Sequence, residues 1–229
     1  MRRSILFIAC LYFCSTTFGQ EYEIGVSLGG TNYVGDIGST SYINPNKLAG
    51  TVFFKYNYNP RVALKATFSY LPIAGDDAKA DSHFRNNRGL SFSNTINEVA
   101  LGLEFNFYEF DISSEDKSWT PYILVELAAF NYGIIIGETE TVNKNKTVLA
   151  LPIGIGFKSK LIGNLAFSLE TKFRYTFEDD LDFISDNNLD FNIEGNSNDW
   201  YMFTGVSIIY TFGRPCLQGL KNLQLHHQK

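Results

Sequence analysis

The chain has 229 residues, a formal net charge of −5 and 45% hydrophobic residues. This length suits one compact domain. The acidic balance argues against a nucleic-acid partner, because phosphate binding requires clustered Lys and Arg. After the first nineteen residues, no apolar run reaches the roughly 20 residues that a membrane-spanning helix needs.

The first nineteen residues have the pattern of a secretion signal. Met1-Arg2-Arg3 is positively charged, residues 5–13 are mostly apolar, and residues 15–19 place small side chains before a cleavage site after Gly19. Cleavage there removes two arginines and no acidic residue, so the net charge changes from −5 to −7. We expect a mature protein that begins at the next residue. A lipoprotein signal that ends at Cys10 is the rival interpretation.

Eight later segments alternate apolar and polar side chains with period two, the pattern of a β-strand with two different faces. They are residues 22–30, 48–59, 62–71, 91–108, 120–136, 148–157, 165–177 and 200–212. The alternation is cleanest in 62–71 and poor in 120–136. In the last segment the apolar face comprises Trp200, Met202, Val206, Ile208, Tyr210 and Phe212. Aromatic ends of such a face are typical of strands that stop at membrane–water interfaces.

The connections between these segments alternate in length. The links after the second and sixth segments are short, at Asn59-Pro60-Arg61 and residues 158–164, whereas those after the first, third, fifth and seventh are long and polar. Outer-membrane barrels have an even number of strands, short periplasmic turns and long outer loops. The sequence therefore predicts an all-β fold, an antiparallel up-and-down transmembrane β-barrel of eight strands. Its place is the outer membrane, with both termini in the periplasm.

The predicted interior face carries charges of both signs. They are Lys55, Lys65, Glu104, Glu170, Lys172 and Arg174. The interior of an eight-stranded barrel is just wide enough for side chains to fill it, and isolated charges there are costly. We therefore expect these groups to pair into a network that plugs the lumen, and a narrow ion path is the alternative.

Candidate catalytic or metal-binding chemistry is sparse. His83 lies in an acidic loop, residues 72–90, but a hydrolase site also needs a nucleophile and an orienting acid. The acidic run 178–199 lacks the regular spacing and turn glycine of a known calcium loop, and His226-His227 belong to a terminal tail. We expect no catalytic, cofactor-binding or metal site and no enzymatic activity.

The tail after the last strand, residues 213–229, is not needed to close a barrel. Cys216 is the single cysteine left after signal cleavage, since Cys10 and Cys14 precede the cleavage site, so no intramolecular disulfide is possible. In an oxidising periplasm an unpaired cysteine suggests an intermolecular disulfide or a reactive thiol. Burial as a small apolar residue is the alternative.

Three motifs in order resemble a family of outer-membrane barrels from Bacteroidetes, the PorG-like family of the type IX secretion system and gliding machinery. They are Gly29-Gly30-Thr31-Asn32-Tyr33-Val34-Gly35-Asp36, then Arg85-Asn86-Asn87-Arg88-Gly89-Leu90-Ser91-Phe92 with Ile96-Asn97-Glu98, then Gly213-Arg214-Pro215-Cys216 with Gly219-Leu220. The resemblance covers nearly the whole mature chain. It implies an eight-stranded barrel without enzymatic activity, associated with a periplasmic ring of PorK- and PorN-like proteins.

These inferences give three regions, a signal peptide (1–19), an outer-membrane barrel (20–212) and a periplasmic tail (213–229). The expected partners are outer-membrane lipid and the PorK/PorN-like ring, which the barrel anchors. We expect the tail to dock on the ring, with Arg214 and Leu217 as anchors because arginine and buried apolar groups dominate interfaces. The candidate contact residues are Arg214, Pro215, Cys216, Leu217, Gly219 and Leu220. The alternative function is a small porin-like channel or a surface adhesin that acts through its long outer loops.

Overall fold

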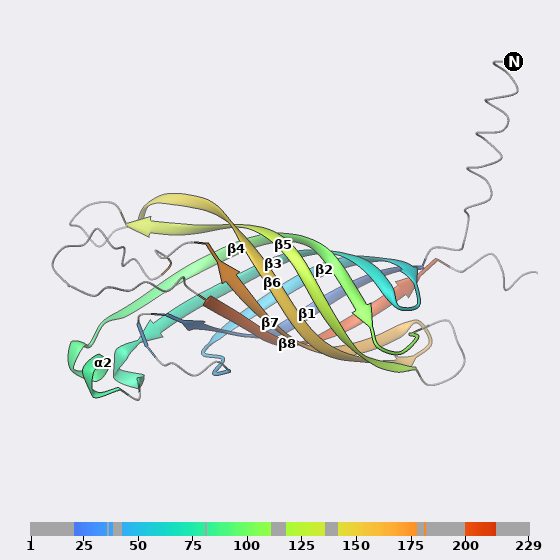
Figure 1. Ribbon diagram of the computed structural model, residues 1–229, viewed down its shortest axis with the longest axis horizontal. Helices are drawn as coiled ribbons and strands as arrows, with labels where there is room; N and C mark the ends of the chain where they lie inside the picture. Colours follow the sequence, from blue (N-terminus) through green and yellow to red (C-terminus); the bar gives the residue numbers. More distant parts are fainter. Residues whose placement is uncertain are drawn as a thin grey trace, which may run out of the picture.

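A closed β-barrel makes up almost all of the residues that the structure describes (Figure 1). The computed structural model describes residues 21–35, 37–38, 43–80, 82–110, 118–135, 142–177, 181 and 200–213. Each strand pairs antiparallel with the next, and β8 pairs back with β1. The strands are β1 (Glu21–Val34), β2 (Lys47–Asn59), β3 (Val62–Asp76), β4 (Ser91–Asn106), β5 (Trp119–Ile135), β6 (Val142–Ile162), β7 (Leu165–Thr176) and β8 (Trp200–Phe212). The predicted eight-stranded up-and-down barrel is confirmed.

Several strands are longer than the sequence predicted, although β8 has the predicted bounds. β1 continues through most of the first motif to Val34, and β3 continues to Asp76, where it still pairs with Ser91 of β4. β6 extends beyond the predicted segment at both ends. As a result the link after β5 is only residues 136–141, which corrects the prediction of a long loop there. Lys158, predicted to begin a turn, lies within β6.

The barrel has two different ends. At the end we call the turn end, the first residue of β1 and the last of β8 lie beside the tight β2–β3 and β6–β7 turns (Figure 1, right). The Asn59 side chain forms the first turn, because its Oδ1 accepts hydrogen bonds from the backbone amides of Arg61 and Val62, both at 2.8 Å. Gly163 makes the second turn with a positive φ of 55°.

The opposite end, which we call the rim end, carries the connections after β1, β3, β5 and β7. The β3–β4 connection folds into a 3-10 helix, η1 (Asp77–Lys79), and a short helix, α2 (His83–Arg88), seen at the left of Figure 1. Within the described ranges, no helix combines the length and the apolar character needed to cross a membrane.

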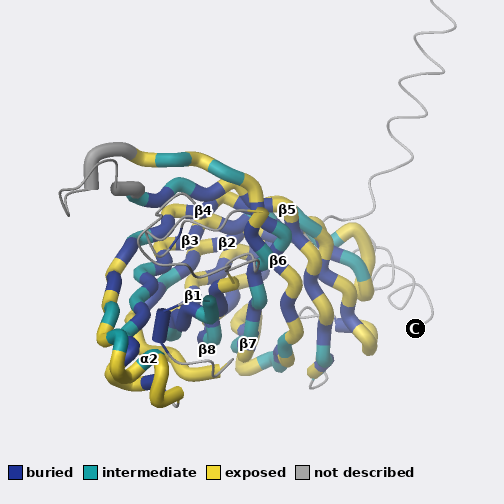
Figure 2. The backbone as a smooth tube through the Cα atoms, turned by 60° about the vertical axis from the view of Figure 1, so that its left-hand side comes forward, coloured by how far each residue is buried: buried dark blue, intermediate teal, exposed yellow. Residues whose placement is uncertain are grey.

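Large apolar side chains cover the outside of the barrel, and polar ones fill the inside. Along β4, the outward-facing Val99, Leu101, Leu103 and Phe105 are between 41% and 59% exposed, whereas the intervening Glu104 is fully buried. The same alternation of exposed and buried positions runs along the other strands (Figure 2). A contiguous apolar outer surface of this kind indicates contact with lipid.

Aromatic rings gather at both edges of this apolar surface. At the turn end, Tyr22 stacks on Phe54 and Phe212 with centroids 5.7 Å away in each case. Towards the rim end, Tyr175 contacts Trp200 edge-on at 5.0 Å. Amphipathic rings prefer the two membrane–water interfaces, so the two groups mark the edges of the lipid-facing band.

The alternation reverses towards the rim end. On β4 beyond Glu98, the buried positions become apolar, at Ile96 and Phe92, and the exposed ones become polar, at Asn97 and Ser93. The buried apolar residues form one cluster: Tyr33, Ile37, Ala49, Leu71, Ile73, Phe92, Ile96, Ala100, Ala128, Phe130, Tyr132, Ala150, Leu181, Tyr201 and Phe203. A sheet with a polar outer face and an apolar inner face is typical of an aqueous environment. The strands at this end therefore continue beyond the lipid-facing band.

Candidate functional site: the charge-filled lumen and the outer rim

Ten charged side chains from seven strands are buried inside the barrel, and each is at most 5% exposed. Five are carboxylates: Glu23, Glu98, Glu104, Glu126 and Glu170. Five are cations: Lys55, Lys65, Lys158, Lys172 and Arg174. The lumen is therefore formally neutral, which is how a low-dielectric interior tolerates so many charges.

Glu104 of β4 is the hub of the network near the turn end. Its Oε1 accepts hydrogen bonds from the Nζ of Lys55 at 2.9 Å and of Lys158 at 2.6 Å. Lys55 also lies 3.5 Å from Glu23 of β1. One fully buried carboxylate thus joins β2, β4 and β6 across the lumen.

A second group lies around β7. The Nζ of Lys65 donates to Glu170 at 2.7 Å, and the hydroxyl of Tyr122 donates to the same Oε2, also at 2.7 Å. Lys172 donates to Glu126 of β5 at 2.8 Å. Closest to the apolar cluster, the guanidinium of Arg174 binds both carboxylate oxygens of Glu98 of β4, at 2.9 and 3.1 Å.

Small residues make room for rings inside the barrel. A Cβ added to Gly156 would collide with the ring of Tyr122, and one added to Gly25 would collide with the ring of Phe53. Glycines at these strand positions therefore relieve crowding in the narrow lumen.

Two groups of buried apolar side chains contact the charged residues. Phe110, from the link after β4, is buried at the turn end with Phe53, Ala166 and Ile209. Its ring centroid lies 4.6 Å from the Nζ of Lys158. The larger apolar cluster lies at the rim end. The charged side chains therefore adjoin the large apolar cluster at the rim end and surround a smaller apolar group towards the turn end.

All six charges predicted to face the lumen do so, and they pair as predicted. The sequence analysis missed Glu23, Glu98, Glu126 and Lys158 as members of this network. Glu98 lies six residues before Glu104 on the same strand, so strand parity puts both side chains inside and was a signal that could have identified Glu98. The signal for Glu126 was hidden because apolar side chains also point inward on β5.

At the rim end, Asp77 is a buried anchor for the β3–β4 connection. Arg88 donates from Nε to its Oδ2 at 2.7 Å, and the backbone amides of Gly38 and Leu90 donate at 2.8 and 3.2 Å. Burial by itself raises the pKa of Asp77, but these hydrogen bonds outweigh it and hold the pKa below its ordinary value of 3.8.

Two of the motifs singled out in the sequence meet at this rim. Tyr33 of the first motif packs edge-on against Phe92 of the second, with ring centroids 4.8 Å apart. Arg85 of the second motif donates to the carbonyl of Gly38, just after the first, at 2.8 Å. Gly89 ends α2 with a φ of 68° and returns the chain to β4. These motif residues thus build one rim structure.

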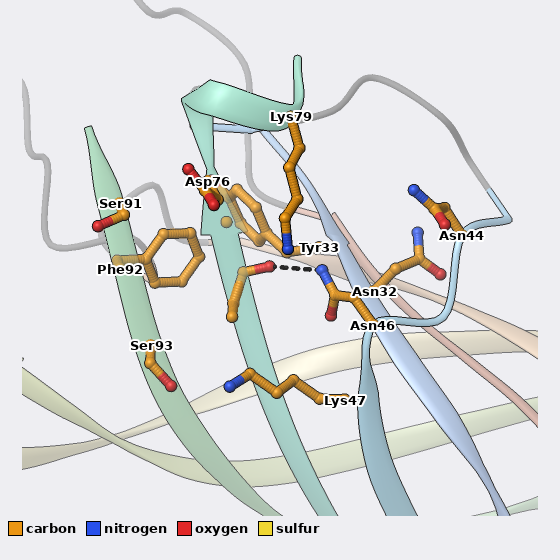
Figure 3. Close-up of a pocket in the computed structure, with 12 residues that line it drawn as sticks. Asn32, Tyr33, Asn44, Asn46, Lys47, Asp76, Lys79, Ser91, Phe92 and Ser93 are labelled. Atoms are coloured by element: carbon orange, nitrogen blue, oxygen red, sulfur yellow. Dashed lines mark hydrogen bonds between the residues drawn. The ribbon is translucent and has the colours of Figure 1, made fainter. Parts of the chain in front are cut away.

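A pocket of about 430 Å³ opens at the rim end, where the ends of β1 and β3 lie next to the starts of β2 and β4 (Figure 3). Asn46 bridges its two sides, since its backbone amide donates to the carbonyl of Thr31 at 2.9 Å and its side chain donates to the carbonyl of Ala74 at 3.0 Å. Lys79 and Lys47 extend into it from η1 and β2.

The other candidate residues from the sequence form no functional site within the described ranges. His83 is exposed on α2, and the nearby Asp77 binds Arg88 instead. No group of three or more His, Cys, Asp or Glu side chains in the described ranges is arranged to hold a metal ion. The tail contacts Arg214, Pro215, Cys216, Leu217, Gly219 and Leu220 lie outside the described residues. So do the signal peptide (1–19), His226-His227 and most of the acidic run 178–199.

A closed barrel with an apolar exterior, two aromatic belts and a charge-filled interior defines a transmembrane β-barrel of the outer-membrane class. A family model described as "Domain of unknown function (DUF6089)" matches residues 2–219, so the chain belongs to this family. No curated protein matches the chain in sequence.

Solved outer-membrane barrels share the fold. Neisserial surface protein A aligns with a TM-score of 0.51 at 10% identity, over 83% of this chain and 97% of that one. OprG from Pseudomonas aeruginosa aligns with a TM-score of 0.47 at 9% identity, over 86% and 98%. Ail, the attachment invasion locus protein of Yersinia pestis, aligns with a TM-score of 0.45 at 10% identity, over 85% and 99%. The names of these three denote surface and outer-membrane proteins.

Proposed function

We propose that this protein is a non-conducting anchor in the outer membrane and a component of the type IX secretion system. In this role the turn end faces the periplasm, and residues 213–229 hold a PorK/PorN-like ring against the membrane. The observation that carries the anchor role is the plugged lumen. A channel needs a continuous aqueous path, whereas here ten buried charges pair with one another across the lumen, next to the apolar cluster at the rim end.

The secretion role is supported by the resemblance of three ordered motifs to the PorG-like family. Two of these motifs are packed together at the rim through Tyr33 and Phe92. The third lies in the tail, which directly follows β8 at the turn end. The short turns of outer-membrane barrels face the periplasm, and the end of β8 at the turn end supports a periplasmic position for the tail.

Truncation after Phe212 tests the secretion role. We expect the truncated barrel to insert normally, as judged by heat-dependent mobility on gels, but secretion by the type IX route to be lost. The Cys216→Ser variant should show on non-reducing gels whether the contact includes an intermolecular disulfide. Normal secretion by the truncated barrel would overturn the anchor role of the tail.

Conductance tests the plugged lumen separately. Purified protein in planar bilayers should give no stable single-channel currents. Reproducible channels that disappear on heat denaturation of the protein would favour the porin-like alternative.

The adhesin alternative also has an observation in its favour, because β3 to β6 extend past the lipid-facing band over their own apolar core. It predicts that replacing residues 77–90 with a short turn abolishes surface binding, whereas the tail truncation leaves it intact.

A further inference from the structure

The rim pocket has an unusual set of side chains for a surface hollow. Two lysines and several amide and hydroxyl groups line it, with a single carboxylate, Asp76. Asp76 is already engaged as the cap of η1, since its Oδ1 accepts from the amide of Ala78 at 3.0 Å. The pocket is therefore cationic, in a chain whose formal net charge is −5.

The donors in this pocket are available to a ligand. Within the described part of the chain, neither Lys47 nor Lys79 makes an ion pair through its Nζ, and the side chains of Ser91 and Ser93 make no hydrogen bond. Asn46, by contrast, is held in place by its two bonds to neighbouring strands. In Figure 3, Lys79 points towards Asn46, and Lys47 crosses β3 towards Ser93.

The pocket also lies at the edge of the lipid-facing band. Lys47 directly precedes Leu48, which is 79% exposed. Ser91 and Ser93 occupy outward-facing positions on β4, beyond the point at which its outer face changes from apolar to polar. A group bound here would sit outside the barrel wall, at the level of the lipid headgroups.

We infer that this pocket binds a phosphorylated saccharide, supplied by the headgroup of an outer-leaflet glycolipid. The two ammonium groups pair with phosphate oxygens. The serine hydroxyls and the Asn44 amide bind sugar hydroxyls. Basic pockets at the membrane surface bind anionic lipid headgroups by the same chemistry. One carboxylate is too few for a cation cage, which uses six or more oxygen ligands for calcium.

This inference rests on the outer-membrane location proposed above, but not on the secretion role. It is tested with the full-length protein in phospholipid nanodiscs, titrated with purified lipopolysaccharide and, separately, with the same lipopolysaccharide after enzymatic dephosphorylation. The pocket variant is Lys47→Gln/Lys79→Gln. Its control, Lys144→Gln/Lys146→Gln, also replaces two lysines, at positions of β6 that do not line the pocket.

We expect lipopolysaccharide to bind the wild type and the control alike, and to bind the pocket variant at least about tenfold more weakly, as loss of a charge-assisted hydrogen bond implies. Dephosphorylation should cause a similar loss with the wild type. Equal binding by the wild type and the pocket variant overturns the inference. An equal loss in both double variants also overturns it, because rim charge in general would then explain binding.

A competition experiment with a soluble sugar phosphate distinguishes a lipid headgroup from a free phosphorylated sugar as the source of the ligand. Glucose 1-phosphate should compete only weakly, because it lacks the membrane-bound remainder of the glycolipid. Tight binding of glucose 1-phosphate with no binding of lipopolysaccharide would overturn the lipid source. Heat-dependent gel mobility of every variant establishes that the barrel is folded, and the tail truncation tests the secretion role independently of these results.

Discussion

Arg174 of β7 and Glu98 of β4 form a fully buried pair that spans the lumen. The guanidinium contacts both carboxylate oxygens, and the hydroxyl of Tyr201 donates to Glu98 Oε2 at 2.8 Å. The pair lies where the charged layer meets the apolar cluster, of which Tyr201 is a member. The pair therefore links two strands that are not neighbours in the sheet.

Breaking this pair should destabilise the barrel strongly. Arg174→Met leaves Glu98 buried without its cation, which costs about 3–5 kcal/mol in buried pairs. The double variant Arg174→Met/Glu98→Gln removes both charges and should recover part of that loss. The measurement is the free energy of unfolding in urea, with the barrel in lipid vesicles. A double variant no more stable than Arg174→Met would contradict the pairing.

The reversal of alternation on β4 makes a second prediction, about membrane depth. Leu101→Arg puts a charge on the lipid-facing band and should cost about 2–4 kcal/mol, whereas Asn97→Arg, four residues towards the rim on the same face, should cost about 0–1 kcal/mol. Both arginines point outward, so the two variants differ only in the depth of the new charge in the membrane. Equal costs in the same unfolding assay would show that the band extends past Asn97.

The third prediction concerns pH. Since the folded-state pKa of Asp77 is lowered from its ordinary value of 3.8, the carboxylate stabilises the rim fully above that value. The stabilisation is lost as the pH falls through the lowered pKa. Protease resistance of the 77–90 connection should therefore decline in strong acid. Asp77→Asn should make the connection labile at neutral pH and remove this pH dependence, while Asp76→Asn, at the adjacent position, should keep it.

The fourth prediction concerns Asn94, which joins β4 to β5 where their backbone pairing ends. Its side-chain amide donates to the carbonyl of Gly133 at 3.0 Å, and its Oδ1 accepts from the Gly133 amide at 3.2 Å. Asn94→Ala leaves both backbone groups without this partner, which should cost about 1–3 kcal/mol. Amide hydrogen exchange at Gly133 should quicken, while that at Leu124, in the paired part of β5, stays unchanged.

The sequence was sufficient for the fold because the barrel wall in lipid obeys a simple rule. Where the outside is lipid and the inside is mainly polar, as along residues 62–71 of β3, period-two alternation indicates both the strand and which of its faces points outward. The rule fails where the inward face also becomes apolar or the outward face becomes polar. On β5, Tyr122, Leu124, Phe130 and Tyr132 all point inward, so hydropathy alternates poorly although burial alternates well. Beyond the lipid-facing band the outer faces of the strands are polar, so in the sequence these strand ends resembled polar loops.

The candidate site was less accessible from the sequence. Six of the ten lumen charges followed from strand parity, but which cation meets which carboxylate depends on the stagger between strands across the barrel. That stagger is set by the closed register and has no local signal. The rim pocket was missed entirely, because its residues come from four separate segments of the chain and no pattern in any one of them indicates a pocket.

The ion pairs of the lumen also have a consequence for how the protein is made. Lys55–Glu104, Lys65–Glu170, Lys158–Glu104, Lys172–Glu126 and Arg174–Glu98 each join strands that are not neighbours in the sheet. A half-built sheet would present these charges to lipid without their partners. Insertion is thus coupled to closure, and the β1–β8 seam should form together with passage of β7 into the bilayer, so that partly assembled barrels do not accumulate in the membrane.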